Sequence, residues 1–105
     1  MHCKQNLQGL LTICRKAGKL QLGLAPVTEH LQQGQVSGVM VCQDTASKSK
    51  KEARFQCRRQ GVPCIELPFT KEEMGWVIGR ACGVIAVCDD GFFRRFQELV
   101  TQTEE

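Results

Sequence analysis

Two short, unbroken apolar runs constrain the fold of this chain more than any other feature. They span residues 38–42 and 84–88 and contain no alternating polar positions. Runs of this kind are typical of strands that are covered on both faces. The segments around them have the spacing of amphipathic helices. The chain is therefore expected to place helices on both sides of a central sheet.

The other segments complete a regular alternation of helices and strands. Helices are predicted at residues 7–17, 26–33, 46–60, 71–79 and 90–100, and further strands at 19–22 and 64–67. The resulting order is α-β-α-β-α-β-α-β-α, which predicts an α/β fold with a single three-layer α/β/α sandwich. We expect one domain over residues 1–105, with an ordered core at about 5–100 and a frayed tail at 101–105.

Short polar residues mark where several helices begin. Aspartates that follow strands also lie where open α/β sheets bind ligands, but a capping role explains them more simply. The predicted caps are Asp44, Thr45 or Ser47 for the helix at 46–60, Thr70 for the helix at 71–79, and Asp89 or Asp90 for the last helix.

Charge is divided unevenly along the chain. Residues 1–60 contain ten Lys/Arg and three Asp/Glu, whereas residues 61–105 contain four Lys/Arg and eight Asp/Glu. The net charge of +3 hides this asymmetry. The basic part includes a strand, a turn at Gly23 and a helix. A strand-to-helix turn in a basic region favours a partner that carries phosphates.

The sequence lacks the motifs of common nucleotide-binding enzymes. No G-x-G-x-x-G follows a predicted strand, and no G-x-x-x-x-G-K-[ST] occurs. A Ser–His–Asp arrangement would have to use His2 or His30, and His30 shares a helix face with Val27 and Leu31. That position favours a packed or half-exposed ring. We therefore predict a protein that is not an enzyme, with no cofactor and no small-molecule substrate.

No membrane segment is expected. No run approaches the ~20 apolar residues that a membrane helix needs. The first residues also lack the apolar core of a signal peptide. The sequence therefore predicts a cytoplasmic protein that does not bind membranes.

Cysteine is frequent in this chain. The seven cysteines are at positions 3, 14, 42, 57, 64, 82 and 88. No two have C-x-x-C spacing, and neither histidine completes a zinc pattern with them. Most lie in apolar strings, where a free thiol packs as a small hydrophobe. We expect reduced thiols and no metal site. Zinc, disulfide and nucleophile roles remain as less favoured alternatives.

The predicted helix at 46–60 is strongly basic. Ala46, Ala53 and Cys57 mark its buried side, so Phe55 lies on the opposite, basic side. Lysine and arginine neutralise phosphates, and an exposed ring can stack on a base. A solvated surface helix explains the charges equally well, and both interpretations remain open. The secondary basic surface predicted here consists of Lys50, Lys51, Arg54, Phe55 and Arg58.

Several short motifs occur in a characteristic order. They are Cys14-Arg15-Lys16-Ala17-Gly18-Lys19, then Gly23, Gly34, residues 39–44 with Ala46-Ser47, Gly61-Val62-Pro63, Met74-Gly75 with Gly79, and Ala86-Val87 running into Asp90-Gly91-Phe92. In this order and spacing, over about residues 7–100, the chain resembles the kink-turn-binding ribosomal-protein family. The Arg-Lys-Ala-Gly-Lys and Asp-Gly-Phe pieces are similar to its small bacterial YlxQ-type members.

The resemblance implies a mixed four-stranded sheet between helical layers. It also implies RNA binding at the turn from the first strand into the second helix, together with the loop before the last strand. Members that bind kink-turns tightly have Gly-x-Asn-Glu-x-x-Lys at this turn. Here the glycine is Gly23, but Ala25, Pro26 and Glu29 occupy the Asn, Glu and Lys positions. The resemblance thus predicts the fold and a weakened form of kink-turn recognition.

The sequence favours a non-enzymatic protein that binds ribosomal or other structured RNA. Ribosomal or other ribonucleoprotein proteins are expected as further partners. Lys19 and Arg80 are expected to contact phosphates, while Gly23 and Leu24 give close backbone approach and apolar cover to an extruded base. The complete set of predicted RNA-binding residues is Lys19, Gly23, Leu24, Ala25, Thr28, Arg80, Ala81, Cys82 and Gly83. The main alternative is a protein-interaction module that has lost RNA. A weaker one is a small-molecule or redox site at Asp44 and Cys88.

Overall fold

The computed structural model describes residues 3–104 and contains the predicted order of five helices and four strands. The elements are α1 (Cys3–Lys16), β1 (Leu20–Leu22), α2 (Leu24–Gln32), β2 (Gly38–Cys42), α3 (Ser47–Gln60), β3 (Cys64–Leu67), α4 (Lys71–Ile78), β4 (Val84–Val87) and α5 (Asp90–Glu104). The fold class predicted from the sequence is confirmed.

The four strands form one mixed sheet in the order β1-β4-β2-β3. β4 is antiparallel to both of its neighbours, with Leu22 opposite Ile85 and Val41 opposite Val84, and β2 is parallel to β3. The C-terminal ends of β1, β2 and β3 therefore meet the N-terminal end of β4 at one edge of the molecule. The loops that follow and precede these ends are brought together there.

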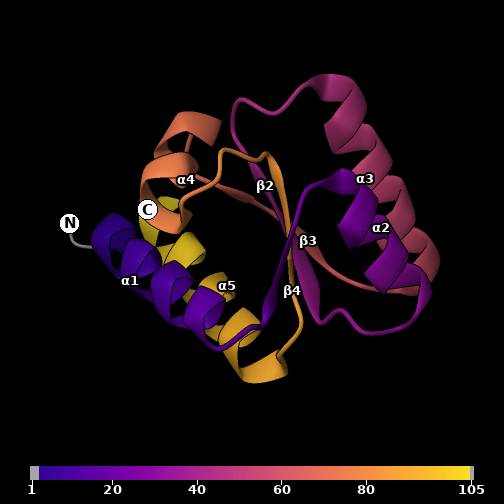
Figure 1. The fold of residues 1–105 in the computed structure, drawn as a ribbon, viewed down its shortest axis with the longest axis horizontal. Helices are drawn as coiled ribbons and strands as arrows, with labels where there is room; N and C mark the ends of the chain where they lie inside the picture. The colour runs from indigo at the N-terminus through magenta and orange to yellow at the C-terminus, as the bar shows by residue number, and fades with distance from the viewer. Residues whose placement is uncertain (1–2, 105) are drawn as a thin grey trace.

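Helices cover both faces of the sheet (Figure 1): α1, α4 and α5 lie on one side, and α2 and α3 on the other. The two central strands alternate between these layers. Met40 and Ile85 point into the first cluster, whereas Val41 and Ala86 point into the second. This alternation explains why the two runs are apolar at every position, since each residue faces one core or the other.

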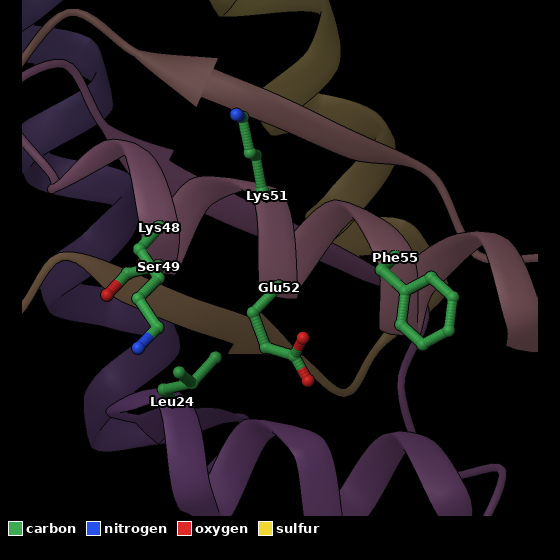
Figure 2. A pocket seen from close by; sticks show the side chains of 6 residues that line it. All are labelled: Leu24, Lys48, Ser49, Lys51, Glu52 and Phe55. Atoms are coloured by element: carbon green, nitrogen blue, oxygen red, sulfur yellow. The ribbon is translucent and has the colours of Figure 1, made fainter.

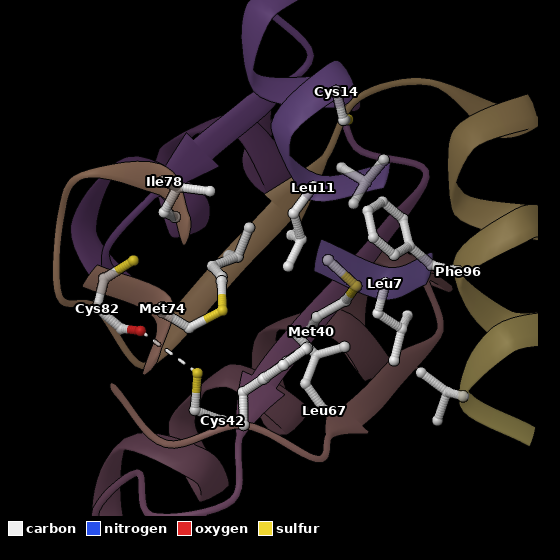
Figure 3. Packing of buried hydrophobic residues seen from close by; sticks show 14 of the residues in the cluster. Leu7, Leu11, Cys14, Met40, Cys42, Leu67, Met74, Ile78, Cys82 and Phe96 are labelled. Carbon is white, nitrogen blue, oxygen red and sulfur yellow. Dashed lines mark hydrogen bonds between the residues drawn. The ribbon is translucent and has the colours of Figure 1, made fainter. Parts of the chain in front are cut away.

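The larger core lies between the sheet and the layer of α1, α4 and α5 (Figure 3). Leu7, Leu11 and Cys14 of α1 lie at helical spacing and are fully buried. Phe96 of α5 is also fully buried in this cluster. Burying a side chain of this size contributes about 1.5–3 kcal/mol relative to exposing it. The first and last helices of the chain are thereby held together against the sheet.

The described cysteines are free in this structure. Four of them are buried, namely Cys14, Cys42, Cys57 and Cys82. The other two, Cys64 and Cys88, are half-buried. The side chain of Cys3 lies outside the described part of the chain. Within the described residues, no group of three or more His, Cys, Asp or Glu side chains is placed to hold a metal ion.

Two of the predicted helix caps are present. Thr70 Oγ1 accepts from the Glu73 N–H at 3.1 Å, and the Glu73 carboxylate accepts from the Thr70 N–H at 2.9 Å. This reciprocal pair is a capping box at the start of α4. At the start of α5, the Asp89 carboxylate accepts from the Phe92 N–H at 2.9 Å. Asp90 does not cap, because its carboxylate accepts from the Ser37 hydroxyl.

The predicted cap of α3 is wrong. Its N-cap residue is Ala46, and no side chain caps it. Asp44 instead accepts from the N–H of Lys71 at 2.9 Å, so it caps α4 across the sheet edge. Thr45 turns inward and donates to the Gly83 carbonyl at 3.0 Å. The strand order brings these loops side by side, and the resulting long-range bonds replace the local one.

Three smaller expectations also need correction. Ala17 was predicted to end the first helix and Ala46 to mark the buried side of the helix at 46–60, but both lie just outside these helices and are exposed. α5 extends to Glu104 and so includes most of the segment that was predicted to be a frayed tail. Thr101 Oγ1 donates to the Gln97 carbonyl at 2.9 Å within this extension.

Candidate nucleic-acid interface

The turn between β1 and α2 is built around Gly23. Its backbone has φ 100° and ψ 152°, a region that side chains strongly disfavour. The Gly23 N–H donates to the Val84 carbonyl at 2.9 Å, and the Gly23 carbonyl accepts from the Val27 N–H at 3.1 Å. The turn is therefore fixed to β4 on one side and to α2 on the other.

Arg80 lies beside this turn although it is 57 positions away in the sequence. A Cβ atom built on Gly23 would be 3.8 Å from a terminal nitrogen of the Arg80 guanidinium. Gly79 ends α4 with φ 79°, and the chain then exposes Arg80 and Ala81 before it enters β4. The predicted pairing of the turn with the loop before the last strand is thus present in the structure. The Gly23 backbone and the Arg80 guanidinium therefore lie at the same edge of the sheet.

Cys82 and Gly83 serve the fold rather than the exposed edge. The Cys82 side chain is buried in the larger core, and its carbonyl accepts from the Cys42 thiol at 3.4 Å (Figure 3). The Gly83 carbonyl accepts from Thr45 Oγ1 at 3.0 Å and from the Cys42 N–H at 2.9 Å. Neither the thiol nor the Gly83 carbonyl is therefore presented to a ligand, and the packing of this loop against RNA stays a prediction.

The residues of α2 that were predicted to bind RNA form the outer part of the turn. Ala25 is exposed, while Leu24 and Thr28 are half-buried. Leu24 packs on the smaller core between the sheet and α3. His30 is also half-buried, as predicted, and its Nδ1 lies 2.9 Å from the Pro26 carbonyl. The ring therefore belongs to the helix and not to the site.

Lys19 does not join this group. It precedes β1, so the three residues of the strand separate it from Gly23. Its carbonyl accepts from the Cys88 N–H at 2.8 Å, which places Lys19 at the start of α5. At about 3.3 Å per strand residue, the backbones of Lys19 and Gly23 are some 13 Å apart. Lys19 lies at the opposite end of the sheet from Arg80.

The secondary basic surface on α3 is also modified by the structure. Lys50 Nζ lies 2.6 Å from a Glu66 carboxylate oxygen and donates to the Gln43 carbonyl at 2.9 Å. Lys50 therefore ties α3 to the edge strand β3 and is not an exposed cation. Lys51, Arg54 and Arg58 are exposed on the solvent side of the helix, as predicted.

Phe55 borders a groove of about 440 Å³ between α2 and α3. Figure 2 shows that Lys48 and Glu52 extend toward α2 and Leu24, whereas Lys51 points away from that helix. The Phe55 ring is 49% exposed, and the Arg59 guanidinium carbon lies 5.8 Å from its centroid. The residues that line the groove are Leu24, Lys48, Ser49, Lys51, Glu52 and Phe55.

Sequence reasoning missed some members of these surfaces. Lys48 and Glu52 were not separated from the other charges of the basic helix, although Leu24 was predicted to lie at the site. Trp76 of α4 was also missed, and it is 75% exposed four residues before Arg80. Helical spacing could have indicated its exposure. Met74 and Ile78 lie one turn apart on the buried side of α4, and position 76 falls on the opposite side.

The structure places this chain among the three-layer α/β/α domains, with a glycine turn beside a cationic loop at one edge of its sheet. Within this class, the chain belongs to the Ribosomal protein L7Ae/L30e/S12e/Gadd45 family, whose model matches residues 5–96. This confirms the resemblance to the kink-turn-binding ribosomal proteins.

Relatives with known names agree with the assignment. The RNA-binding protein YlxQ of Enterococcus faecium is 28% identical over 97 residues, which cover 92% of this chain and 93% of that protein. The large ribosomal subunit protein eL30 of Aeropyrum pernix is 26% identical over 92 residues, covering 86% of this chain and 88% of that protein.

Solved structures share the fold. A protein of unknown function from Bacillus halodurans is 28% identical and superposes with a TM-score of 0.84, covering 90% of this chain and 96% of that chain. The 15.5kD RNA binding protein of Giardia lamblia is 16% identical with a TM-score of 0.72, covering 99% and 89%, and supports the fold alone. Among the helices that the structure describes, none has the length and apolarity needed to cross a membrane.

Proposed function

We propose that this protein is a non-enzymatic RNA-binding protein that holds structured RNA at the edge formed by Gly23 and Arg80. The observation that carries the proposal is the contact between the turn and the loop, which places a close-approach backbone beside a guanidinium. Arginine binds phosphate oxygens, and a glycine without a side chain lets an RNA approach the turn closely. Membership of a ribosomal-protein family, and the relative named as an RNA-binding protein, support the same function.

Recognition of a standard kink-turn by this edge is proposed to be weak. Ala25 offers no side-chain donor or acceptor, Pro26 also lacks a backbone N–H, and Glu29 is exposed and negative. A guanine edge left without partners costs roughly 1–3 kcal/mol for each missing group. Phosphate contacts and close packing then supply most of the affinity.

The exposed face of α3 is proposed to extend the RNA-binding surface. The groove between α2 and α3 begins at Leu24, directly after Gly23, so RNA bound at the edge lies next to it. Lys48 and Lys51 supply positive charge there, and Phe55 supplies a ring on which an unpaired base can stack. Ribosomal or other ribonucleoprotein proteins are the expected neighbours of such an RNA.

A protein-interaction module on the same fold is the second candidate. Two exposed apolar side chains favour it, Trp76 at 75% and Ile13 at 58% exposure. Large exposed aromatic side chains are enriched in protein interfaces. In this case RNA would not bind at the Gly23 edge, and a partner protein would cover α4 or α1.

The two candidates are separated by an RNA-binding titration of matched arginine variants. Fluorescence anisotropy of a labelled kink-turn hairpin is measured between about 50 and 200 mM salt for the parent, Arg80→Gln and Arg94→Gln. Arg94 is an exposed residue of α5, on the other helical layer. Each lost phosphate contact lowers the magnitude of the salt slope by about 0.7–0.9, so Arg80→Gln should weaken binding and Arg94→Gln should not. Salt-independent or absent RNA binding by the parent would favour the protein-interaction module.

A further inference from the structure

Two cysteine side chains meet where the end of α3 approaches the start of β3. Cys57 lies in the last turn of α3 and is 1% exposed, whereas Cys64 is the first residue of β3 and is half-buried. Cys57 belongs to the smaller core, Cys64 packs against it, and both side chains line one hollow at the surface. Nothing in the RNA-binding function uses this pair.

The pair opens to solvent through a hollow of about 240 Å³. Arg54 and Arg58 flank the hollow, one helical turn apart on α3, and Val62 completes its wall. Both arginines are exposed. A small uncharged oxidant can therefore reach Cys64 without local unfolding, in surroundings that favour a negative sulfur.

Cys64 differs from the other described cysteines in its environment. Burial raises the pKa of Cys14 and of Cys42 to about 12, and it also raises the pKa values of Cys82 and Cys88. The pKa of Cys64 is lowered, first by the neighbouring Cys57 thiol and then, against the opposing effect of burial, by the nearby charge of Arg54. The thiolate is the reactive form of cysteine.

The chain between the two cysteines is held in place before any reaction. Gly61 turns the backbone with φ 67°, and the Val62 N–H donates to the Cys57 carbonyl at 2.9 Å. The Pro63 carbonyl accepts from the Val39 N–H at 3.0 Å, which anchors the start of β3 to the sheet. The two cysteines thus lie at the two ends of an ordered turn and face the same hollow.

We infer that Cys57 and Cys64 form a peroxide-reactive dithiol, in which Cys64 is the attacking residue and Cys57 the resolving residue. The Cys64 sulfur attacks one oxygen of hydrogen peroxide, so that an S–O bond forms, the O–O bond breaks and the released hydroxide is protonated to water. The Cys57 sulfur then attacks the sulfenic sulfur, an S–S bond forms, and the S–O bond breaks. The departing hydroxide takes the Cys57 proton and leaves as a second water. The two thiols lose two electrons, and the peroxide gains them.

The inference is tested on the reduced, full-length protein with hydrogen peroxide as the oxidant. The reaction is stopped with catalase, free thiols are blocked with iodoacetamide, and tryptic peptides are analysed by mass spectrometry. Cleavage after Arg58 and Arg59 separates the peptides of residues 55–58 and 60–71, so a disulfide between them is seen directly. The expected result is that this linked pair forms first, on the order of tenfold faster than any oxidation of Cys88.

Two variants identify the role of each thiol. In Cys57→Ser, Cys64 should accumulate as a sulfenic acid that dimedone traps, because no thiol resolves it. In Cys64→Ser, the fast reaction should be lost, while the matched control Cys88→Ser should oxidise like the parent. The inference is overturned if the parent forms its first disulfide at other cysteines, or if Cys64 is oxidised no faster than Cys88. This peptide map of the parent decides the question even if a variant does not fold.

Discussion

The sheet edge at Gly23 and the solvent face of α3 are both cationic, yet they are built in different ways. At the edge, one guanidinium lies beside a turn whose N–H and carbonyl groups are bonded to β4 and α2. On α3, several cations extend into solvent, and the one that is held in place, Lys50, is held by Glu66 and not toward a ligand.

This difference determines what each surface can contribute to RNA binding. A fixed turn with one arginine beside it positions a particular part of an RNA, because the shape of the turn does not change on binding. Mobile cations on a helix face neutralise phosphates without selecting a structure. We therefore propose that the edge recognises the shape of an RNA and that α3 supplies general electrostatic attraction.

The largest expected effect comes from restoring the family's polar residues at the edge. The triple variant Ala25→Asn, Pro26→Glu, Glu29→Lys should tighten binding to a standard kink-turn by about 4 kcal/mol, from micromolar toward nanomolar Kd. Each restored base-edge pair is worth roughly 1–3 kcal/mol. Anisotropy titrations of the parent and the triple variant at one salt concentration measure the gain. A parent that already binds at nanomolar Kd would mean that other residues recognise the RNA.

A second prediction separates structural from exposed residues within the edge. A Cβ atom at Gly83 would lie 2.4 Å from Thr45 Oγ1, whose side chain is buried and bonded to the Gly83 carbonyl. Gly83→Ala should therefore lower the free energy of unfolding by about 1–3 kcal/mol. Gly9→Ala is the matched control, because no atom outside its own helix lies within 4 Å, and it should stabilise by about 0.5–1 kcal/mol. Equal urea midpoints for Gly83→Ala and the parent would contradict the packing described for this loop.

The third prediction concerns the face of α3. Lys51→Gln combined with Arg54→Gln should reduce the magnitude of the salt slope by up to about 1.5, while the preference for a kink-turn over a plain duplex stays unchanged. Arg94→Gln with Arg95→Gln on α5 removes the same charge from exposed positions and should leave the slope near that of the parent. If both double variants change the salt slope equally, the net charge of the protein determines the slope and α3 has no special role in RNA binding.

The smallest effect is expected at the helix that carries the Arg80 loop. The hydrogen bond from the Thr70 N–H lowers the pKa of Glu73 in the folded protein. The Lys4 ammonium, whose Nζ lies 3.0 Å from Glu73 Oε2, lowers it further. The charge of Glu73 therefore stabilises the fold above the ordinary carboxyl pKa, and this stabilisation is lost as the pH falls through the lowered value. Glu73→Gln should cost about 0.5 kcal/mol near neutral pH and progressively less in acid. Urea unfolding at several pH values measures the difference, which should not grow on acidification.

Much of the fold could be predicted because it depends on local patterns. Residues 38–42 and 84–87 are apolar at every position, and both are central strands. The neighbours of each strand could not be predicted from these patterns, since an apolar run is compatible with any partner. The antiparallel position of β4 between β1 and β2 follows from packing over the whole chain, and the resemblance to a family supplied only the mixed character of the sheet.

The candidate site shows the same limit. Gly23 and Arg80 were predicted as partners from the family resemblance, and they are adjacent. The roles of Asp44, Lys50 and Cys82 depend on contacts with residues at least 16 positions away, so local sequence could not indicate them. In each case a residue that looked available for a local cap or a ligand is used by a long-range contact.

The central claim is that RNA is held at the Gly23 and Arg80 edge. Nitrogen-15 NMR spectra of the full chain, recorded with and without a kink-turn hairpin, test it residue by residue. The largest shift changes should fall on the N–H groups of Gly23, Leu24, Ala25, Arg80 and Ala81, with smaller changes along α3. Shift changes confined to the layer of α1, α4 and α5, with the Gly23 turn unaffected, would contradict the claim.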